Sequence, residues 1–223
     1  MSAAGRQGQN GSAEKGVQDR LIEAAEALFC TRGFNETSVR GIAAAAGCNV
    51  ASVNYYFGGK DNLYVEVWRR HLTGLREVRL ASIQQVMSRS GQPALEELLR
   101  AYANSFIEPL VDGGRSERFI TLMAREMVEP HLPRDMFLND MIAPVLSALG
   151  QALQRICPRL EQGRVPLVIL SVVGQLMQTV LSKGLFERGS HPDVPQVDLD
   201  EMVEHIVRFS AAGIRDYQHE SGE

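Results

Sequence analysis

Between residues 38 and 60 the chain reads SVRGIAAAAGCNVASVNYYFGGK, and it carries donors of several kinds in a short span. A guanidinium, an amide, hydroxyls, two adjacent phenols and an ammonium alternate here with alanine, valine and glycine. Cations, hydroxyls and backbone N–H groups bind phosphate oxygens, and small polar side chains reach base edges in the major groove of DNA. The residues suited to contact base edges are Val50, Ala51, Ser52, Asn54 and Tyr55. Thr37 or Ser38 is suited to contact a phosphate, and Arg40 and Lys60 supply positive charge.

Two short helices joined by a tight turn would position these side chains. Ala43 to Ala46 favour a helix and leave room for a close neighbour. Gly47 can end that helix, and Asn49 can cap the next. An apolar face on each helix is predicted to close a small core, formed by Val39, Ile42, Ala46, Cys48, Val53 and Tyr56. Ordinary helical hairpins share this pattern, but the tyrosines and the glycine–glycine–lysine that follow favour a DNA-binding element.

Flanking helices are predicted on both sides of this pair. Residues 17–32 have the three–four spacing of an amphipathic helix, which Gly33 ends, and a further helix with a broad apolar stripe starts near Lys60. Residues 1–15 are rich in Gly, Ser, Gln and Ala and lack apolar periodicity, which predicts a disordered leader.

The segments LIEAAEALFCTRGFNETSVRGIAAAAG and NVASVNYYFGGKDNLY resemble the DNA-binding domain of the TetR family of bacterial regulators. The resemblance covers residues 17–72, and its NVASVNYYFGGK motif is most similar to the branch that contains PsrA and CecR. It implies phosphate contacts by Thr37, Ser38, Tyr56 and Lys60, base or near-base contacts by Ser52, Asn54 and Tyr55, and Val50 and Ala51 at the floor of the groove. Asn54 stands where many family members have tyrosine.

The remainder of the chain is predicted to be helical, so the fold class is all-α, with about nine helices. Helices are expected over residues 93–110, 116–129, 134–156, 165–186 and 199–217, with a kink or break at Pro144. The expected organisation is a leader over 1–15, a helix-turn-helix domain over 16–62, and a ligand-binding and dimerisation domain over 63–220.

The last two helices carry more apolar surface than a surface helix needs. Members of the TetR family dimerise through these helices, and a two-fold dimer would read a palindromic operator. The alternative is that both helices are simply core. The expected dimer interface consists of Leu170, Val173, Met177, Leu181, Met202, Ile206 and Phe209.

The middle helices are rich in methionine and aromatic residues. Methionine adapts to varied shapes, so an apolar pocket for a small effector is one hypothesis and a plain helical core is the other. The candidate lining is Tyr102, Phe106, Phe119, Met123, Met127, Phe137, Met141 and Gln178, with Asn104, Arg125 and His131 as further polar contacts.

Enzymatic and metal-binding sites are not predicted. The five histidines are scattered without an HExxH pattern, and Gly58-Gly59-Lys60 lacks the first glycine of a phosphate loop. Cys30, Cys48 and Cys157 have no metal-ligand spacing, so we expect buried thiols and no cofactor.

Charge and hydropathy are compatible with a regulator in the cytoplasm. The net charge is −4, but residues 1–72 hold eight Lys/Arg and seven Asp/Glu, so the acidic excess lies in the remainder. The N-terminus has no export signal, and the apolar residues 165–181 contain polar side chains, which predicts a buried helix and no membrane association.

These patterns predict a homodimeric DNA-binding regulator, most simply a repressor released by a small apolar or amphipathic effector such as a fatty acyl compound. The alternatives are an activator or a regulator controlled by a protein partner, and a ligand-binding or enzymatic helical protein whose DNA-binding domain is vestigial.

Overall fold

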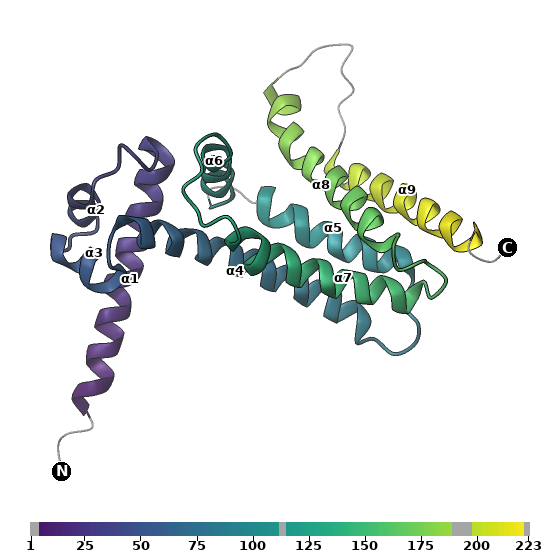
Figure 1. Cartoon of the computed structure of the whole chain (residues 1–223), viewed down its shortest axis with the longest axis horizontal. Coiled ribbons are helices and arrows are strands. Elements are labelled where there is room, and N and C mark those ends of the chain that lie inside the picture. The colour runs from purple at the N-terminus through teal and green to yellow at the C-terminus, as the bar shows by residue number, and fades with distance from the viewer. Residues whose placement is uncertain (1–4, 112–114, 189–197, 221–223) are drawn as a thin grey trace. The chain divides into compact units, whose positions relative to one another are not determined.

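The computed structural model describes residues 5–111, 115–188 and 198–220. In these ranges the chain is all-α, as predicted, and forms no strand. Its helices are α1 (Gly5–Arg32), α2 (Val39–Ala45), α3 (Val50–Phe57), α4 (Lys60–Met87), α5 (Leu95–Val111), α6 (Arg115–Val128), the π-helix η1 (Leu138–Ile142), α7 (Ala143–Ile156), α8 (Val165–Arg188) and α9 (Leu199–Glu220) (Figure 1).

The helices form two compact units. The first contains residues 1–72 and 114–136, and the second contains residues 73–113 and 137–223. This division differs from the predicted boundary at residue 62, because the first part of α4 and the whole of α6 belong to the same unit as α1, α2 and α3. The chain therefore passes between the units three times, once inside α4.

The core of the first unit is closed by α6. Leu21, Phe29, Ile42, Val53 and Leu63 are fully buried and come from four successive helices. Trp68 of α4 is also fully buried, and its ring lies 5.8 Å from that of Phe119 on α6. Burying one such aliphatic or aromatic side chain contributes roughly 1.5–3 kcal/mol, so a three-helix unit gains substantially from the added helix.

Capping side chains and a glycine mark the ends of the short helices α2 and α3. Ser38 caps α2, its Oγ accepting a hydrogen bond from the N–H of Gly41 at 3.1 Å. Gly47, at φ 62°, ends it, and the N–H of Cys48 reaches the carbonyl of Ala43 at 2.9 Å. Asn49 caps α3, its Oδ1 accepting from the N–H of Ala51 at 2.9 Å. The cap predicted at Asn49 and the glycine stop predicted at Gly47 are confirmed.

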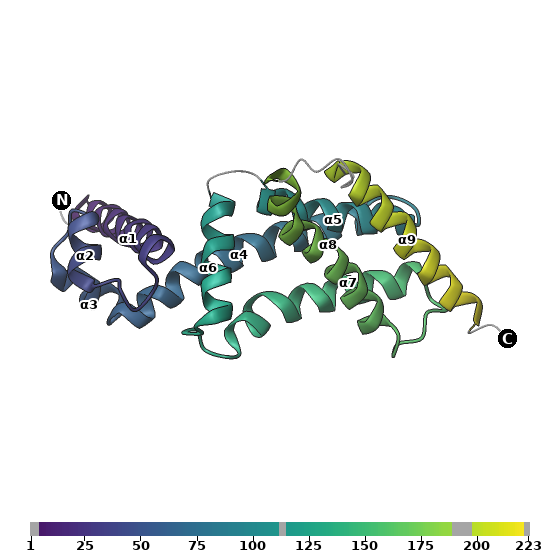
Figure 2. The ribbon, with the colours of Figure 1, turned by 90° about the horizontal axis from the view of Figure 1, so that it is seen from above.

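The second unit is a bundle in which α9 packs against α5 and α8, and α7 packs against α8 (Figure 2). Its core contains large side chains that are almost wholly inaccessible to solvent. They are Leu98, Leu99, Tyr102, Leu149, Leu153, Leu176, Ile206 and Val207.

Two predicted elements differ from the observed ones. Helix α1 begins at Gly5, within the segment 1–15 for which we predicted disorder, while residues 1–4 lie outside the described ranges. This leader contains alanine, glutamine, glutamate and lysine and no proline, so an existing helix can propagate through it. The helix predicted over 134–156 is instead a π-helix that continues directly into α7, with Pro144 in the first turn of α7.

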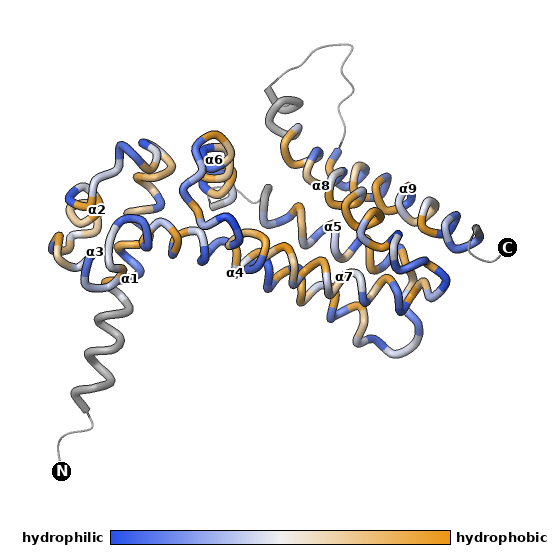
Figure 3. Tube along the Cα trace, in the orientation of Figure 1, coloured by the Kyte–Doolittle hydropathy of each residue, from blue (hydrophilic) through white to orange (hydrophobic). Residues whose placement is uncertain are grey.

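Helix α8 is less buried than predicted. Its segment Val165–Ser182 is long and apolar enough to cross a membrane by length and composition, and only 33% of it is buried within the protein. Figure 3 shows hydrophobic positions recurring along this helix. The prediction of a buried helix therefore holds for one side of α8, and the other side faces outward.

The left-handed turn between α2 and α3 yields a stability prediction. Gly47→Ala should lower the free energy of unfolding by about 1 kcal/mol, because a side chain at positive φ is strained even though nothing lies within 4 Å of the new Cβ. Gly74→Ala is the matched control at an exposed position in the middle of α4, and it should raise the free energy of unfolding by up to about 1 kcal/mol. Urea denaturation at fixed protein concentration measures both, and equal effects would contradict the assignment of the turn.

Candidate nucleic-acid interface

The outer face of α3 is the candidate interface. Val50 is 42% exposed and Tyr55 is 75% exposed, and Ala51 and Asn54 are also exposed. Ser52 is half-buried. The opposite side of the helix is held in the core by Val53, so the two sides have separate roles. A helix that presents small and polar side chains in this way can reach base edges in the major groove.

Other predicted contacts lie around this face. Ser38 and Arg40 are exposed at the start of α2, and Arg40 is the one cation in the sequence between Val39 and Phe57. Tyr56 is half-buried, and its ring lies 4.8 Å from that of Tyr55 in an edge-to-face arrangement. These side chains can donate hydrogen bonds or charge next to α3.

Thr37 does not belong to this surface. The residue is 1% exposed, and its hydroxyl donates to the carbonyl of Gly33 at 2.6 Å. A buried hydroxyl that is already committed to a backbone carbonyl cannot also contact a phosphate. The prediction for Thr37 is therefore corrected: it ties the end of α1 to the start of α2.

Lys60 has a local partner as well. Its Nζ donates to the carbonyl of Phe34 at 3.0 Å and lies 4.1 Å from the centre of the Phe34 ring. The ammonium therefore fastens the start of α4 to the turn after α1. The predicted phosphate contact by Lys60 would compete with these interactions.

Arg20 supports the turn between α2 and α3, a role that no pattern in the sequence indicated. Its Nε donates to the carbonyl of Ala46 at 3.3 Å, and its Nη2 lies 3.6 Å from the sulfur of Cys48. The carbonyl of Ala46 is at the C-terminal end of α2, where a positive charge is favourable. Arg20 therefore joins α1 to the connection between α2 and α3.

Arg125 of α6 binds the C-terminal end of α1. Its Nε donates to the carbonyl of Cys30 at 3.1 Å, and its Nη2 donates to that of Thr31 at 3.2 Å. These are the carbonyls that a helix leaves without internal partners at its end. The prediction that Arg125 contributes to an effector pocket is thus replaced by a structural link to the DNA-binding helices.

Glu126 joins α6 to α4 on the same side. Its Oε2 accepts from the Tyr64 hydroxyl at 2.8 Å, and its Oε1 accepts from the N–H groups of His131 and Leu132, both at 2.7 Å. Burial raises the pKa of Tyr64, and the hydrogen bond to Glu126 adds to this effect. Glu126 therefore organises the end of α6.

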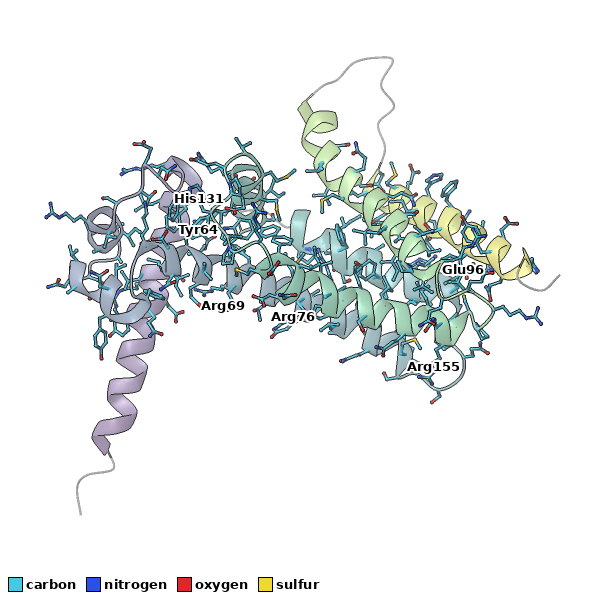
Figure 4. All side chains as sticks on the ribbon, in the orientation of Figure 1. Tyr64, Arg69, Arg76, Glu96, His131 and Arg155 are labelled. Atoms are coloured by element: carbon cyan, nitrogen blue, oxygen red, sulfur yellow. The ribbon has the colours of Figure 1, made fainter. Side chains whose placement is uncertain are left out.

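His131 completes this junction, where Figure 4 labels it beside Tyr64. Its ring lies 4.3 Å from that of Phe34 and 6.1 Å from that of Tyr64, and Nδ1 is 2.8 Å from the carbonyl of Glu129. His131 was predicted as a polar contact of an effector. It packs instead against the turn that follows α1.

The prediction of buried thiols holds for Cys157, whereas Cys30 and Cys48 are half-buried. Burial raises the pKa of Cys30 to about 11, and the nearby Glu26 carboxylate adds to this rise. Burial also raises the pKa of Cys157. Among the described residues, no group of His, Cys, Asp and Glu side chains could hold a metal ion.

The residues predicted to line an effector pocket are divided between the two units. Phe119 packs on Trp68 and His71 in the first unit, Met123 is half-buried there, and Met127 is 77% exposed. The second unit holds the remaining predicted residues, of which Tyr102, Phe106 and Met141 are buried, Phe137 is half-buried and Gln178 is exposed.

The predicted dimer residues lie mostly on an exposed apolar face of α8 and α9. Leu170, Met177, Leu181 and Phe209 are between 40% and 64% exposed, and the neighbouring Leu167 is 61% exposed. Val173 and Met202 are half-buried. Ile206 is the exception, because at 2% exposure it packs inside its own protomer and is unavailable to a partner.

Two models of known protein families together match most of the chain. Residues 21–67 match the model of the bacterial regulatory proteins of the tetR family. Residues 95–214 match the C-terminal domain of the HTH-type transcriptional dual regulator CecR. This protein belongs to the TetR family. It is thereby a member of a family of transcriptional regulators, with a C-terminal domain of the CecR type.

Curated relatives are similar over part of their length. The HTH-type transcriptional dual regulator CecR of Shigella flexneri is 33% identical over 140 residues, which are 60% of this chain and 61% of that protein. The probable HTH-type regulator YttP of Bacillus subtilis is 27% identical over 129 residues, or 56% of this chain and 62% of that protein. The matches thus span less than two thirds of these relatives.

Solved structures share the fold. The fatty acid degradation regulator FadR from Bacillus halodurans gives a TM-score of 0.63 at 18% identity and covers 89% of this chain and 96% of its own. A TetR-like regulator from Rhodococcus sp. RHA1 gives 0.60 at 18% identity with the same coverages. At this identity the likeness concerns the fold alone.

The junction between α4 and α6 can be tested with conservative substitutions. Tyr64→Phe should lower the free energy of unfolding by about 0.5–1.5 kcal/mol, because it removes the hydrogen bond to Glu126 from a buried site. Tyr55→Phe makes the same chemical change on an exposed ring and should leave stability within about 0.5 kcal/mol of the parent. Thermal unfolding compares the two, and an equal response would show that Glu126 does not stabilise this junction.

Proposed function

We propose that this protein is a transcriptional repressor that binds a palindromic operator as a homodimer and is released by a small effector. The observation that carries this proposal is the exposed face of α3, a helix that is capped at both ends, packs against α2 and is anchored in the core by Val53. Rigid support is what a recognition helix needs, because base edges are read by hydrogen bonds of narrow geometry.

In the proposed complex the N-terminal part of α3 enters the major groove. Asn54 and Tyr55 would read base edges, with Val50 and Ala51 close to the groove floor. Ser38 and Arg40 would contact phosphates beside it. Tyr56 would add a further phosphate contact, whereas Lys60 would do so only by leaving the carbonyl of Phe34.

Dimerisation would cover the exposed apolar face of α8 and α9. Leu167, Leu170, Met177 and Leu181 repeat at helical spacing on one side of α8, and Phe209 adds to this face from α9. A second copy related by a two-fold axis would bury the same side chains from both protomers. Ser171, Gln175 and Gln178 on α8 and the acidic start of α9 favour a protein partner over lipid, in keeping with a regulator in the cytoplasm.

A dimer would also supply the area of contact with DNA that specific recognition needs. One short recognition helix reads few bases, and two copies about 34–36 Å apart would enter successive major grooves on one side of the duplex. Specificity then requires a two-fold symmetric operator, so the repressor function depends on the interface formed by the second unit.

Effector release would use the elements shared between the units. Helix α4 belongs to both, and α6 is joined to the second unit by the chain on each side of it. An effector that binds the second unit and displaces α6 would pull on the carbonyls of Cys30 and Thr31 through Arg125. A difference of about 1.4 kcal/mol between the two states changes operator affinity tenfold.

The effector is proposed to be apolar or amphipathic, because Tyr102, Phe106 and Met141 are buried in the second unit and contribute aromatic and thioether groups there. Fatty acyl compounds are one class that fits such surroundings. Activation at some promoters is a second candidate function, which the description of the matching C-terminal family as that of a dual regulator favours.

The DNA-binding proposal predicts a specific effect of Arg40. Arg40→Ala should weaken binding to the DNA upstream of the protein's own gene and reduce the slope of log affinity against log salt by about one unit, since one phosphate contact is lost. Arg159→Ala removes the same charge from an exposed site in the second unit and should leave the slope unchanged. Gel-shift titrations over a range of salt concentrations measure this; no binding by the parent protein would refute the function itself.

The dimer proposal predicts dissociation on adding charge to α8. Leu181→Glu should shift the protein toward monomer in sedimentation experiments, because the side chain is 62% exposed in the protomer and would be buried in the dimer. Val128→Glu, at a site that is 86% exposed on α6, should leave the dimer intact. If both variants stayed dimeric, the interface would lie elsewhere.

A further inference from the structure

Arg79 is a buried cation without an anionic partner. It lies in the part of α4 that belongs to the second unit, and the residue is 4% exposed. Its Nη1 donates to the sulfur of Met141 at 3.6 Å, its guanidinium lies 4.1 Å from the centre of the Phe106 ring, and its Nε is buried without an acceptor. Within the described ranges, no carboxylate forms an ion pair with it.

Such an arrangement is energetically unfavourable. A guanidinium stays charged at any ordinary pH, and removing it from water costs several kcal/mol unless oxygens replace the water. A thioether is a weak acceptor and an aromatic ring gives only part of the compensation. Burial lowers the pKa of Arg79 and raises that of the nearby Tyr102, which shows the same lack of solvation.

Other arginines of the second unit have oxygen partners. Arg76, one turn earlier in α4, donates to the carbonyl of Asp140 at 2.9 Å, and Arg100 and Arg215 pair with Glu204 and Glu96. Arg76 and Glu96 are labelled in Figure 4. Among the described residues of the second unit, the fold thus supplies oxygen partners for these more exposed arginines and none for the side chain of Arg79.

The surroundings of Arg79 define the molecule that would compensate it. Phe106, Met141 and the ring of Tyr102 are apolar, and Ser105, which is 5% exposed, adds a hydroxyl 3.0 Å from that of Ser82. Met141 lies on the π-helix η1, a conformation frequent at functional sites, and its thioether can move aside easily. An anionic group on an apolar body fits both parts of this environment.

We propose that Arg79 binds the carboxylate of a small amphipathic effector, whose apolar part lies against Phe106, Tyr102 and Met141. The edge of the guanidinium formed by Nε and Nη2 matches a carboxylate in a side-on pair, and Nε is the atom that lacks an acceptor. That this ligand is the effector rests on the proposed function, whereas the carboxylate site itself does not.

The first test needs no ligand. Arg79→Met keeps the apolar volume and removes the unpartnered charge, so it should raise the midpoint of thermal unfolding by about 2–4 °C. Arg76→Met is the matched control, since it removes the same charge one turn away together with a made hydrogen bond, and it should leave the midpoint unchanged or lower it. A lower midpoint for Arg79→Met than for the parent would overturn the proposal, because Arg79 would then be a structural residue.

The second test uses straight-chain carboxylates from hexanoate to dodecanoate, each below its micelle concentration, with the primary alcohols of equal length. At concentrations about 100-fold above the dissociation constant, the best carboxylate should raise the midpoint of the parent and of Arg76→Met by several degrees. It should raise that of Arg79→Met no more than the matching alcohol does. Equal stabilisation of the parent by acids and alcohols, or by neither, would overturn the proposal.

Operator affinity separates this proposal from the repressor function. If a carboxylate stabilises the parent and not Arg79→Met, but leaves operator affinity unchanged, the carboxylate site stands and effector release is wrong. If carboxylates stabilise Arg79→Met as much as the parent while both proteins bind the operator, the site is wrong and DNA binding stands.

Discussion

The end of α1 is the place on which the DNA-binding unit depends. Arg125 of α6 binds the last free carbonyls of α1, Lys60 binds the carbonyl of Phe34 just beyond them, and Thr37 closes the following turn through Gly33. A helix end leaves carbonyls without partners, and Arg125 binds two of them here, while Lys60 and Thr37 bind carbonyls of the turn that follows. Side chains of α4 and α6 therefore help to fix the turn that leads from α1 into α2.

This arrangement gives α6 two roles. It closes the core of a small unit by burying Phe119 and Leu122, and it presents Arg125 and Glu126 to α1 and α4. Packing and hydrogen bonding thus come from the same helix, so a shift of α6 would change both together. Such coupling is what a regulator requires if an event in one unit is to alter the geometry of another.

The second unit contains two unfavourable features that a partner would relieve. The apolar side of α8 and α9 is exposed to solvent, and the charge of Arg79 is buried without a counter-ion. A protein retains such features against their cost where function needs them, since binding energy from a subunit or a ligand can offset them. The first points to a second copy of the chain and the second to an anion.

The amino-acid sequence by itself determined the helices, the cap at Asn49, the stop at Gly47 and the family, because these depend on local spacing and on residues within a few positions of one another. It also indicated the apolar surplus of α8 and α9. Only the tertiary structure decided that Thr37 is buried, that Ile206 faces its own core, and that Arg125 and His131 support α1. Those contacts join residues up to about a hundred positions apart, and helical periodicity carries no information about which distant carbonyl a side chain will meet. For the same reason the isolation of Arg79 is invisible in the sequence: an arginine on a helix is ordinary until the fold buries it beside a ring and a thioether.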